Sequence, residues 1–327
     1  MRPRITTKTQ PQTQLLRQAS LVLGIDAGAT KTAAAIGDMT RLLSVGKSGP
    51  GNLHTTKPDD LIKHLQQAVT EAHSRTGAFR SVVVGMAGVD SPHDQIKAER
   101  IVKKALAKWL RPHTRLTVVN DIHIVRRSGS DDPYGIALIA GTGSHCFGMN
   151  QHGDIAYAGG LEYILADEGS GYEMGVKVLR AAVRSSDGRI KPTKLQQAVL
   201  RHFHIASVRA LEPIVYHGQG LNKTKIAKLA KLVDDLAAKG DWRAKEILTE
   251  SLNELTLHVA AIVQRLQLTK VPFDLVVAGG LFDIQATKFL QQFKQRIKRV
   301  APHATVIKPQ HPPVWGAVRL AQDELAA

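Results

Sequence analysis

The chain has 327 residues, of which 43% are hydrophobic and 22% are charged, and this length is enough for two domains with sizeable cores. No apolar run approaches the roughly 20 residues that cross a bilayer, and the basic stretch 1–20 lacks a signal peptide's apolar segment, so we expect a cytoplasmic protein with a loose N-terminal extension and no membrane partner. The formal net charge of +16 attracts polyanions, but the basic residues are spread out and only 5% of residues are aromatic, so nucleic acid is a weak alternative partner.

The first predicted element is a strand over residues 21–26 that ends at Asp26. A turn of small and polar residues follows, and two further strands, 32–36 and 41–45, complete a meander. Backbone N–H groups in such a turn can approach an anion closely, and a neighbouring carboxylate can hold Mg²⁺. The turn therefore predicts a nucleotide-phosphate loop, while an ordinary hairpin with a basic tip stays open as the alternative.

Helical spacing of apolar residues then predicts helices over 58–75 and 92–110. They alternate with short apolar strands, 81–85 and 116–119, and the second of these ends at Asn120 and Asp121. Alternation of strands and helices after a meander predicts an α/β domain with a mixed sheet.

The same pattern restarts at residue 135. A strand over 135–140 is followed by the turn 141–144, which carries Thr142, Gly143 and Ser144, and by strands 145–149 and 154–158. This order matches the opening meander element for element, so the chain is predicted to contain two related domains. We expect each domain to present one hairpin turn to a common cleft and a polyphosphate.

The remaining elements are mostly helical. Apolar spacing predicts helices over 169–184, 194–201, 226–240, 242–266, 284–300 and 314–325, and strands over 273–278 and 304–307. The strand 273–278 ends at Gly279 and Gly280.

Polar and glycine residues gather where apolar strands end, which is where ligands bind in open α/β sheets. Asp121 is the best candidate for a general base, and its alternative role is a helix or turn cap. Asp167 and Glu168 precede a helix, where they are equally compatible with capping and with binding a ligand. The single cysteine, Cys146, excludes a disulfide framework and a Cys-rich metal site within one chain, and it is expected to be buried and inert.

Six motifs occur in an order that resembles the BadF/BadG/BcrA/BcrD ATPase family, and within it the N-acetylglucosamine kinases and bacterial glucosamine kinases. They are residues 26–32, 85–89, 120–121, 141–144, 167–172 and 279–280. The resemblance covers about residues 21–322. It implies the α/β fold of the actin-like ATPase superfamily, with two duplicated ribonuclease-H-like domains and a central nucleotide and sugar cleft. The expected domains are 21–119 with 313–327, and 120–312.

The resemblance also implies a role for each matching residue. ATP and Mg²⁺ are the expected cofactors, an amino sugar is the expected partner, and Asp121 would accept the proton of a sugar hydroxyl, with O6 as the expected acceptor of the γ-phosphoryl group. Asp26 would lie near the metal. The ATP-binding residues would be Gly28, Thr30, Lys31, Thr32, Thr142, Gly143, Ser144, Gly279 and Gly280. The sugar-contacting residues would be Asn52, Asn120, Gly160 and Asp167.

The chain departs from the family pattern at several positions. Ala27 and Ala29 stand where glycines are common, so a positive φ at either would strain the first loop. His145 stands where asparagine is common, and Leu161 replaces a tryptophan. Glu162 adds a charge beside Leu161, from which we hypothesise a preference for an unacetylated amine.

Two other functions stay open at this point. One is an activator ATPase of a 2-hydroxyacyl-CoA dehydratase or reductase system, although that branch uses cysteines to hold an iron–sulfur cluster between subunits and this chain has one cysteine. The other is a nucleotide or sugar sensor without turnover. A homodimer is allowed by the sequence.

Overall fold

The computed structural model describes residues 21–73, 78–217 and 220–326, so the expected N-terminal extension lies outside the described residues. The described residues divide into two compact units. The first unit contains the residues up to Asp131 together with those from Pro309 onward, and the second is Asp132–Lys308. No helix in this part of the chain has both the length and the apolar character that a membrane span requires.

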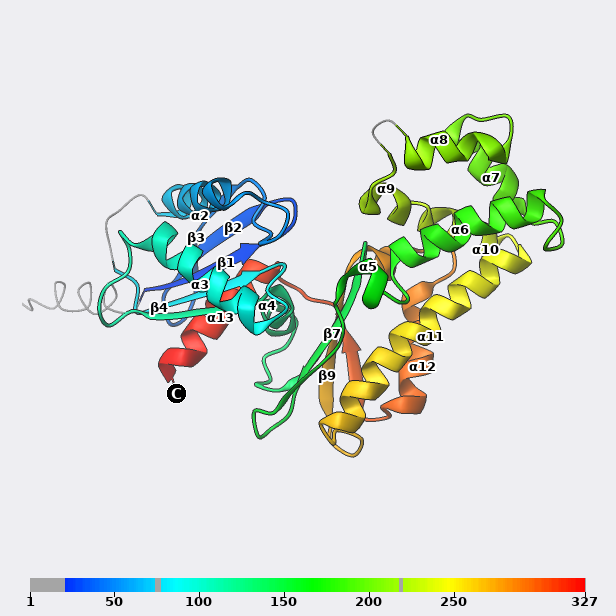
Figure 1. Ribbon diagram of the computed structural model, residues 1–327. Helices are drawn as coiled ribbons and strands as arrows, with labels where there is room; N and C mark the ends of the chain where they lie inside the picture. Colours follow the sequence, from blue (N-terminus) through cyan, green and yellow to red (C-terminus); the bar gives the residue numbers. More distant parts are fainter. Residues whose placement is uncertain (1–20, 74–77, 218–219, 327) are drawn as a thin grey trace, which may run out of the picture. The chain divides into compact units, whose positions relative to one another are not determined.

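The first unit is built on a five-stranded mixed sheet with the order β3-β2-β1-β4-β5 (Figure 1). The first three strands form the predicted antiparallel meander, and β4 and β5 continue the sheet parallel to β1. The strands are β1 (Val22–Ala27), β2 (Thr32–Gly37), β3 (Leu42–Ser48), β4 (Ser81–Met86) and β5 (Arg115–Asn120).

Helices cover both faces of this sheet. Alternate residues of β1, such as Leu23 and Ile25, pack in one core, while Val22 on the opposite face packs in another. The first core includes residues of α2 (Pro58–Ala72) and α3 (Pro92–Leu106), and the second includes residues of α4 (Asp121–Gly129) and α13 (Pro313–Ala326). The period-2 alternation of strand side chains therefore produces a three-layer unit.

The second unit repeats the strand arrangement, with the order β10-β9-β6-β7-β8. Strands β6, β7 and β8 form an antiparallel meander, and β9 and β10 continue the sheet in parallel from β6. Both sheets thus extend from a meander through two parallel strands, which confirms the predicted repeat. The strands are β6 (Gly135–Ala140), β7 (Ser144–Met149), β8 (Ile155–Gly159), β9 (Phe273–Ala278) and β10 (Ala304–Ile307).

The second unit carries more helix than the first. Its core joins one face of the sheet to the long helices α6, α11 and α12 (Figure 1). The helices are α5 (Glu162–Leu165), α6 (Gly171–Ser186), α7 (Lys194–Phe203), α8 (Leu211–Tyr216), α9 (Lys223–Ala227), α10 (Ala230–Ala238), α11 (Trp242–Arg265) and α12 (Phe289–Val300), with short 3₁₀ turns at η1 (Val208–Ala210) and η2 (Gly280–Asp283).

One helix next to the predicted site was not expected from the sequence. Residues directly after β5 form α4, and α13 packs on α4 and on β1. Gly316 of α13 lies so close to α4 that an added Cβ would meet the carbonyl oxygen of Ile124. This packing is the physical reason why residues 120–131 cluster with the first unit, whereas the sequence expectation placed them in the second domain.

Candidate functional site

The register of the first sheet brings Asp26 and Asp121 to the same edge. Asp26 pairs with Gly85 of β4, which pairs in turn with Val119 of β5, two residues before Asp121. Because β1, β4 and β5 are parallel, their carboxyl ends lie together, which is where ligands bind in such sheets.

The carboxylates at this edge perturb one another. Burial, followed by the charges of Asp26 and Asp90, raises the pKa of Asp121 to about 7. Burial also raises the pKa of Asp26 to about 6, with the charge of Lys31 acting in the opposite direction. A carboxylate with a pKa near neutrality can take up and release a proton at physiological pH, as a general base must.

Asn120 holds this arrangement in place. Its side-chain oxygen accepts from the backbone N–H of Ile122 at 3.0 Å and so caps α4. Its amide group donates to Asp90 Oδ1 at 2.7 Å and to the Val89 carbonyl at 3.2 Å. The side chain is buried and both of its N–H bonds are used within the protein, so the sugar contact expected of Asn120 stays a prediction.

The first predicted loop is a four-residue turn between β1 and β2. The N–H of Gly28 donates to the carbonyl of Lys31 at 3.0 Å, which closes the turn. Thr30 and Lys31 are exposed at its tip. Within the described residues no acceptor is found for the N–H groups of Ala29, Thr30 and Lys31, so these donors are free for an anion.

Thr32 and the two alanines behave differently from the rest of the loop. Thr32 is fully buried, and no described group bonds to its hydroxyl, which lies beneath Gly51. Neither Ala27 nor Ala29 has a positive φ, so the turn holds them without the strain that the sequence raised as a concern. The glycine-poor sequence is therefore compatible with this loop.

Asn52 lies in the loop between β3 and α2, beside the same edge. Its side-chain oxygen accepts from the N–H groups of His54 and Thr55, both at 2.9 Å. The N–H of the next residue, Leu53, donates to the Ala87 carbonyl just after β4. No described residue accepts from the side-chain amide of Asn52, which leaves two donors for a ligand.

The second predicted loop is a three-residue turn between β6 and β7. The N–H of Gly141 donates to the carbonyl of Gly143 at 2.9 Å. Two carbonyls of the turn, those of Gly141 and Thr142, accept from Gly171 and Tyr172 at the start of α6. No acceptor is found among the described residues for the N–H groups of Thr142 and Gly143, which are therefore free for phosphate oxygens.

Asp167 clamps this second turn. Its Oδ1 accepts from the N–H of Ser144 at 3.1 Å, and its Oδ2 forms an ion pair with Lys223 at 2.7 Å. An added Cβ at Gly143 would lie 2.7 Å from Asp167 Oδ1, so any larger residue there would displace the Asp167 carboxylate. The cap of α6 is Ser170 instead, which accepts from the N–H of Glu173. Asp167 therefore serves the loop rather than the helix.

Gly279 and Gly280 adjoin the second turn. Gly279 has a φ of 102°, a conformation that favours glycine, and an added Cβ would meet the Ala140 carbonyl. An added Cβ at Gly141 would lie 3.7 Å from the backbone nitrogen of Gly280. The predicted phosphate and adenosine motifs of the second unit thus lie side by side.

The residues after β8 lie against the same turn. The N–H of Gly160 donates to the carbonyls of Ser144 and Ala166. The ring of His145 packs beneath Gly160 and stacks on Tyr157, and burial followed by the charge of His258 lowers the pKa of His145 to about 4. His145 is therefore a neutral packing residue, whereas Leu161 is exposed.

Lys223 also lies beside the second turn, although no pattern in the sequence points to it. It lies on α9, and its amino group contacts Glu162 at 2.6 Å as well as Asp167 at 2.7 Å. Although burial opposes its charge, these hydrogen bonds hold the pKa of Lys223 above its usual value. Glu162 therefore already has a cationic partner. No spacing in the sequence relates residue 223 to residues 162 and 167, since the contact depends on how α9 packs.

The carboxylates of the first unit fit a magnesium ion. Among the described residues, no three acidic or histidine side chains converge as a complete metal shell. Mg²⁺ often binds through one or two carboxylates while keeping water and phosphate ligands, and Asp26 supplies one carboxylate beside the charges of Asp90 and Asp121. The charges of Asp26 and Asp90 raise the pKa of Asp121, so a cation near these carboxylates is electrostatically favoured.

The single cysteine does not contribute to the residues gathered at either predicted loop. Cys146 lies within β7, is fully buried, and burial raises the pKa of its thiol. A buried, protonated thiol is a poor metal ligand.

Comparison with known proteins gives one consistent result. The BadF/BadG/BcrA/BcrD ATPase family matches residues 23–321. The chain is 32% identical to the N-acetylmuramic acid/N-acetylglucosamine kinase of Clostridium acetobutylicum, over 93% of this chain and 98% of that protein. It is 26% identical to the N-acetyl-D-glucosamine kinase of Dictyostelium discoideum, over 92% and 97%. The crystal structure of a candidate N-acetylglucosamine kinase from Chromobacterium violaceum has the same fold, with a TM-score of 0.68, 21% identity and coverage of 92% and 99%.

Proposed function

Because the chain belongs to the BadF/BadG/BcrA/BcrD ATPase family, we propose that it is an ATP-dependent kinase that transfers the γ-phosphoryl group to a hydroxyl, O6, of an amino sugar. The observation that carries the proposal is the pair Asp26 and Asp121 at one sheet edge, with a pKa of about 7 at Asp121. A sensor without turnover would need no carboxylate tuned in this way.

Asp121 accepts the proton of the sugar hydroxyl as that oxygen attacks the γ-phosphorus. The γ-phosphoryl group passes to the sugar oxygen, and ADP leaves with the electron pair of the broken bond. The bonds of Asn120 to α4 and to Asp90 fix the position of Asp121. Because ordering the base in advance lowers the cost of reaching the transition state, Asn120 acts as a positioning residue.

Free backbone donors bind the phosphates. In the first unit they are the N–H groups at the tip of the turn beside Lys31, and in the second those of Thr142 and Gly143. Gly279 and Gly280 accept the adenosine part. Asp26 would hold Mg²⁺, which would supply positive charge to the phosphate oxygens. Thr32 contacts the phosphates only if the segment around Gly51 moves, since its hydroxyl is buried.

Sugar recognition involves the donors of Asn52 and the segment from Gly160 to Asp167. The ion pair of Lys223 with Glu162 bears on the hypothesis that Glu162 selects an unacetylated amine. A substrate ammonium has to compete with Lys223 for this carboxylate, so the acetylated sugar is the better candidate. Glu162→Gln is then expected to leave the preference between glucosamine and N-acetylglucosamine unchanged.

The function is tested by coupled ADP release with glucosamine, N-acetylglucosamine, N-acetylmuramic acid and glucose, each with and without Mg²⁺. Sugar-dependent ADP release in which kcat/KM for N-acetylglucosamine exceeds that for glucose at least 10-fold supports the proposal. ADP release that does not depend on any sugar would contradict it. Nuclear magnetic resonance of the product then identifies the phosphorylated oxygen, and a product other than the 6-phosphate would overturn the O6 assignment alone.

A further inference from the structure

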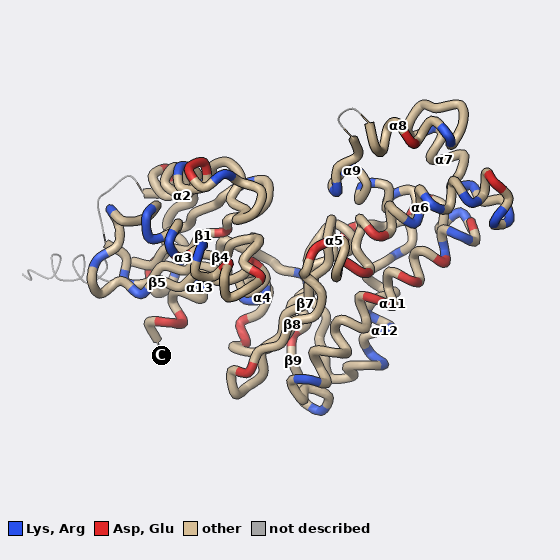
Figure 2. The backbone as a smooth tube through the Cα atoms, in the orientation of Figure 1, with Lys and Arg blue, Asp and Glu red and all other residues tan. Residues whose placement is uncertain are grey.

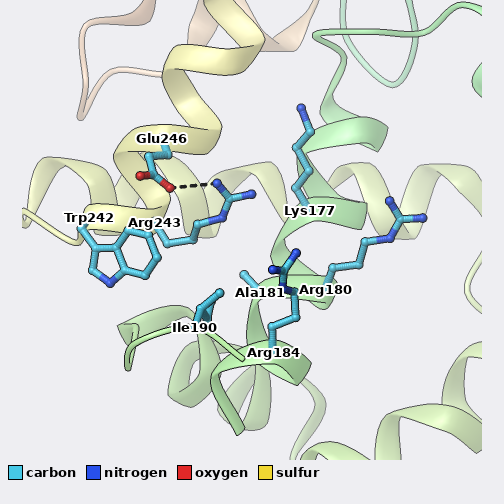
Figure 3. Close-up of a pocket in the computed structure, with 8 residues that line it drawn as sticks. All are labelled: Lys177, Arg180, Ala181, Arg184, Ile190, Trp242, Arg243 and Glu246. Carbon is cyan, nitrogen blue, oxygen red and sulfur yellow. Dashed lines mark hydrogen bonds and ion pairs between the residues drawn. The ribbon is translucent and has the colours of Figure 1, made fainter. Parts of the chain in front are cut away.

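A basic pocket lies in the second unit, between α6 and α11. It has a volume of about 410 Å³. Its polar wall carries Lys177, Arg180 and Arg184 from α6 and Arg243 from α11 (Figure 3). A pocket of this volume is in the range that accommodates small molecules. Arg180 lies nine residues along α6 from Gly171, roughly 14 Å at the helical rise, so the pocket is separate from the second loop.

The charges in the pocket are only partly balanced. Lys177 contacts Glu173 and Glu250, both at 2.9 Å, and Arg243 contacts Glu250 and Glu246, also at 2.9 Å. These contacts set three carboxylates against two cations and hold this part of the pocket in shape.

Two arginines remain without a carboxylate partner. No described residue forms an ion pair with Arg180 or Arg184. The charge of Arg184 contributes to lowering the pKa of Asp187, but Asp187 is already bound by Arg189 at 2.7 Å. Although basic residues occur along most helices of both units (Figure 2), here four of them line one pocket, in which Arg180 and Arg184 are exposed. The cavity therefore has a positive excess suited to a phosphate dianion.

The opposite wall is apolar and fixed. It consists of Trp242 and Ile190, and the indole N–H of Trp242 donates to the Pro192 carbonyl at 3.1 Å. Asp241 caps α11 and also accepts from the hydroxyl of Thr193 at 2.8 Å, which ties the loop to the start of that helix. Lys191 lies 4.9 Å from the centre of the Trp242 ring. An aromatic side chain on the wall opposite two arginines is compatible with a molecule that carries both a ring and a phosphate.

We propose that the pocket between α6 and α11 is a second ligand site, which binds a small phosphomonoester with a ring. The phosphate lies on Arg180 and Arg184, and the ring lies against Trp242 and Ile190. Monosaccharide phosphates and mononucleotides share this chemistry. The inference goes beyond the proposed kinase reaction and does not depend on it.

The test uses the fluorescence of Trp242. The chain has three tryptophans, and replacing the others, W109F and W315F, leaves one reporter at the pocket. The probes are glucosamine 6-phosphate, adenosine monophosphate, sn-glycerol 3-phosphate and inorganic phosphate. A saturable change with a ring-bearing probe, at least 10-fold tighter than with glycerol phosphate, is expected. The two ring-bearing probes distinguish sugar from nucleotide as the source.

Charge reversal in the pocket provides the decisive comparison. The double variant R180E/R184E is expected to lose at least 10-fold in affinity, because both phosphate partners become repulsive. K245E on α11 makes a charge reversal outside the pocket lining and is expected to bind as the parent protein does. Equal weakening by K245E, unchanged binding by R180E/R184E, or no saturation by any probe would each overturn the proposal.

The result is separable from the kinase proposal. R180E/R184E should retain sugar-dependent ADP release at saturating substrates, because neither arginine belongs to the two loops. Loss of probe binding with turnover intact supports a second site. Loss of both in a variant whose circular dichroism and melting temperature match those of the parent would place the phosphate in the kinase site and overturn the proposal.

Discussion

The two hairpin turns of the molecule have the same topological position and different physical character. The turn after β1 is exposed at its tip, holds two alanines and lies beside Asp26 and Asp121, whose pKa values are both raised. The turn after β6 is clamped by Asp167 and by the start of α6, and its carboxylate is paired with Lys223. One turn is therefore defined by unbalanced charge and the other by close packing.

This difference indicates that a duplicated fold divides its tasks between its copies. Unbalanced carboxylates are unfavourable for stability but suit a base and a cation site, and such groups concentrate at functional sites. The contacts that clamp the second turn already hold its backbone N–H donors in place, so little further ordering is needed when a ligand binds. Changes at the first turn should therefore alter catalysis and pH dependence, whereas changes at the second should alter stability and nucleotide binding together.

The largest expected effect comes from Asp121→Asn. The amide cannot accept the hydroxyl proton, so kcat should fall by roughly 10²–10⁴-fold, the usual contribution of general base catalysis. ATP binding should persist, because the free backbone donors are unchanged. Sugar-dependent ADP release measures kcat, and isothermal titration with a non-hydrolysable ATP analogue measures binding. Turnover near that of the parent would exclude Asp121 as the base.

The next effect is the pH dependence of kcat/KM. Asp121 must be ionised to act as a base, and its pKa of about 7 means that protonation removes the active form as the pH falls. We expect kcat/KM to decrease about 10-fold per pH unit below pH 7 and to level off above pH 8. The profile of Asp121→Asn should lack this limb, and the same slope in the variant would assign it to another group.

Much of this arrangement could be predicted from the sequence, because it depends on local pattern. The repeated strand–turn–strand order and the polar residues at strand ends follow from period-2 alternation and from small residues in tight turns. The role of Asn120 was harder to predict from the sequence. The sequence Asn-Asp followed by apolar residues at helical spacing is an N-cap signal, but α4 is only nine residues long and rich in β-branched residues. Lys223 could not be predicted, since its contacts span more than 50 residues.

A third prediction concerns a smaller effect, the change in stability when glycine is replaced by alanine in each of the two turns. Gly143→Ala places a Cβ 2.7 Å from Asp167 Oδ1, so the clamp must shift, and we expect a loss of about 1–3 kcal/mol in the free energy of unfolding with weaker ATP binding. Gly28→Ala places a Cβ 3.5 Å from the Lys31 carbonyl, an ordinary contact, so the change should stay within about 1 kcal/mol. Chemical denaturation of the two variants measures both. Equal losses would show that the first turn is packed as tightly as the second.

The last expected effect is a gain in stability from Asp121→Asn. The folded pKa of about 7 lies above the ordinary value of 3.8, so between these values the folded protein binds more protons than the unfolded chain. The free energy of unfolding contributed by this group therefore falls as the pH rises from about 4 to 7, and the full penalty is present above pH 7.

Asparagine carries no charge and removes the penalty, so the variant should be more stable than the parent by about 1–3 kcal/mol at pH 8 and nearly equal to it at pH 4. Denaturant unfolding at both pH values tests this, with Asp59→Asn, an exposed carboxylate in α2, as the control. A variant that is less stable at pH 8 would mean that Asp121 is held by favourable contacts, and the contrast between a charge-strained first turn and a packed second turn would then be wrong.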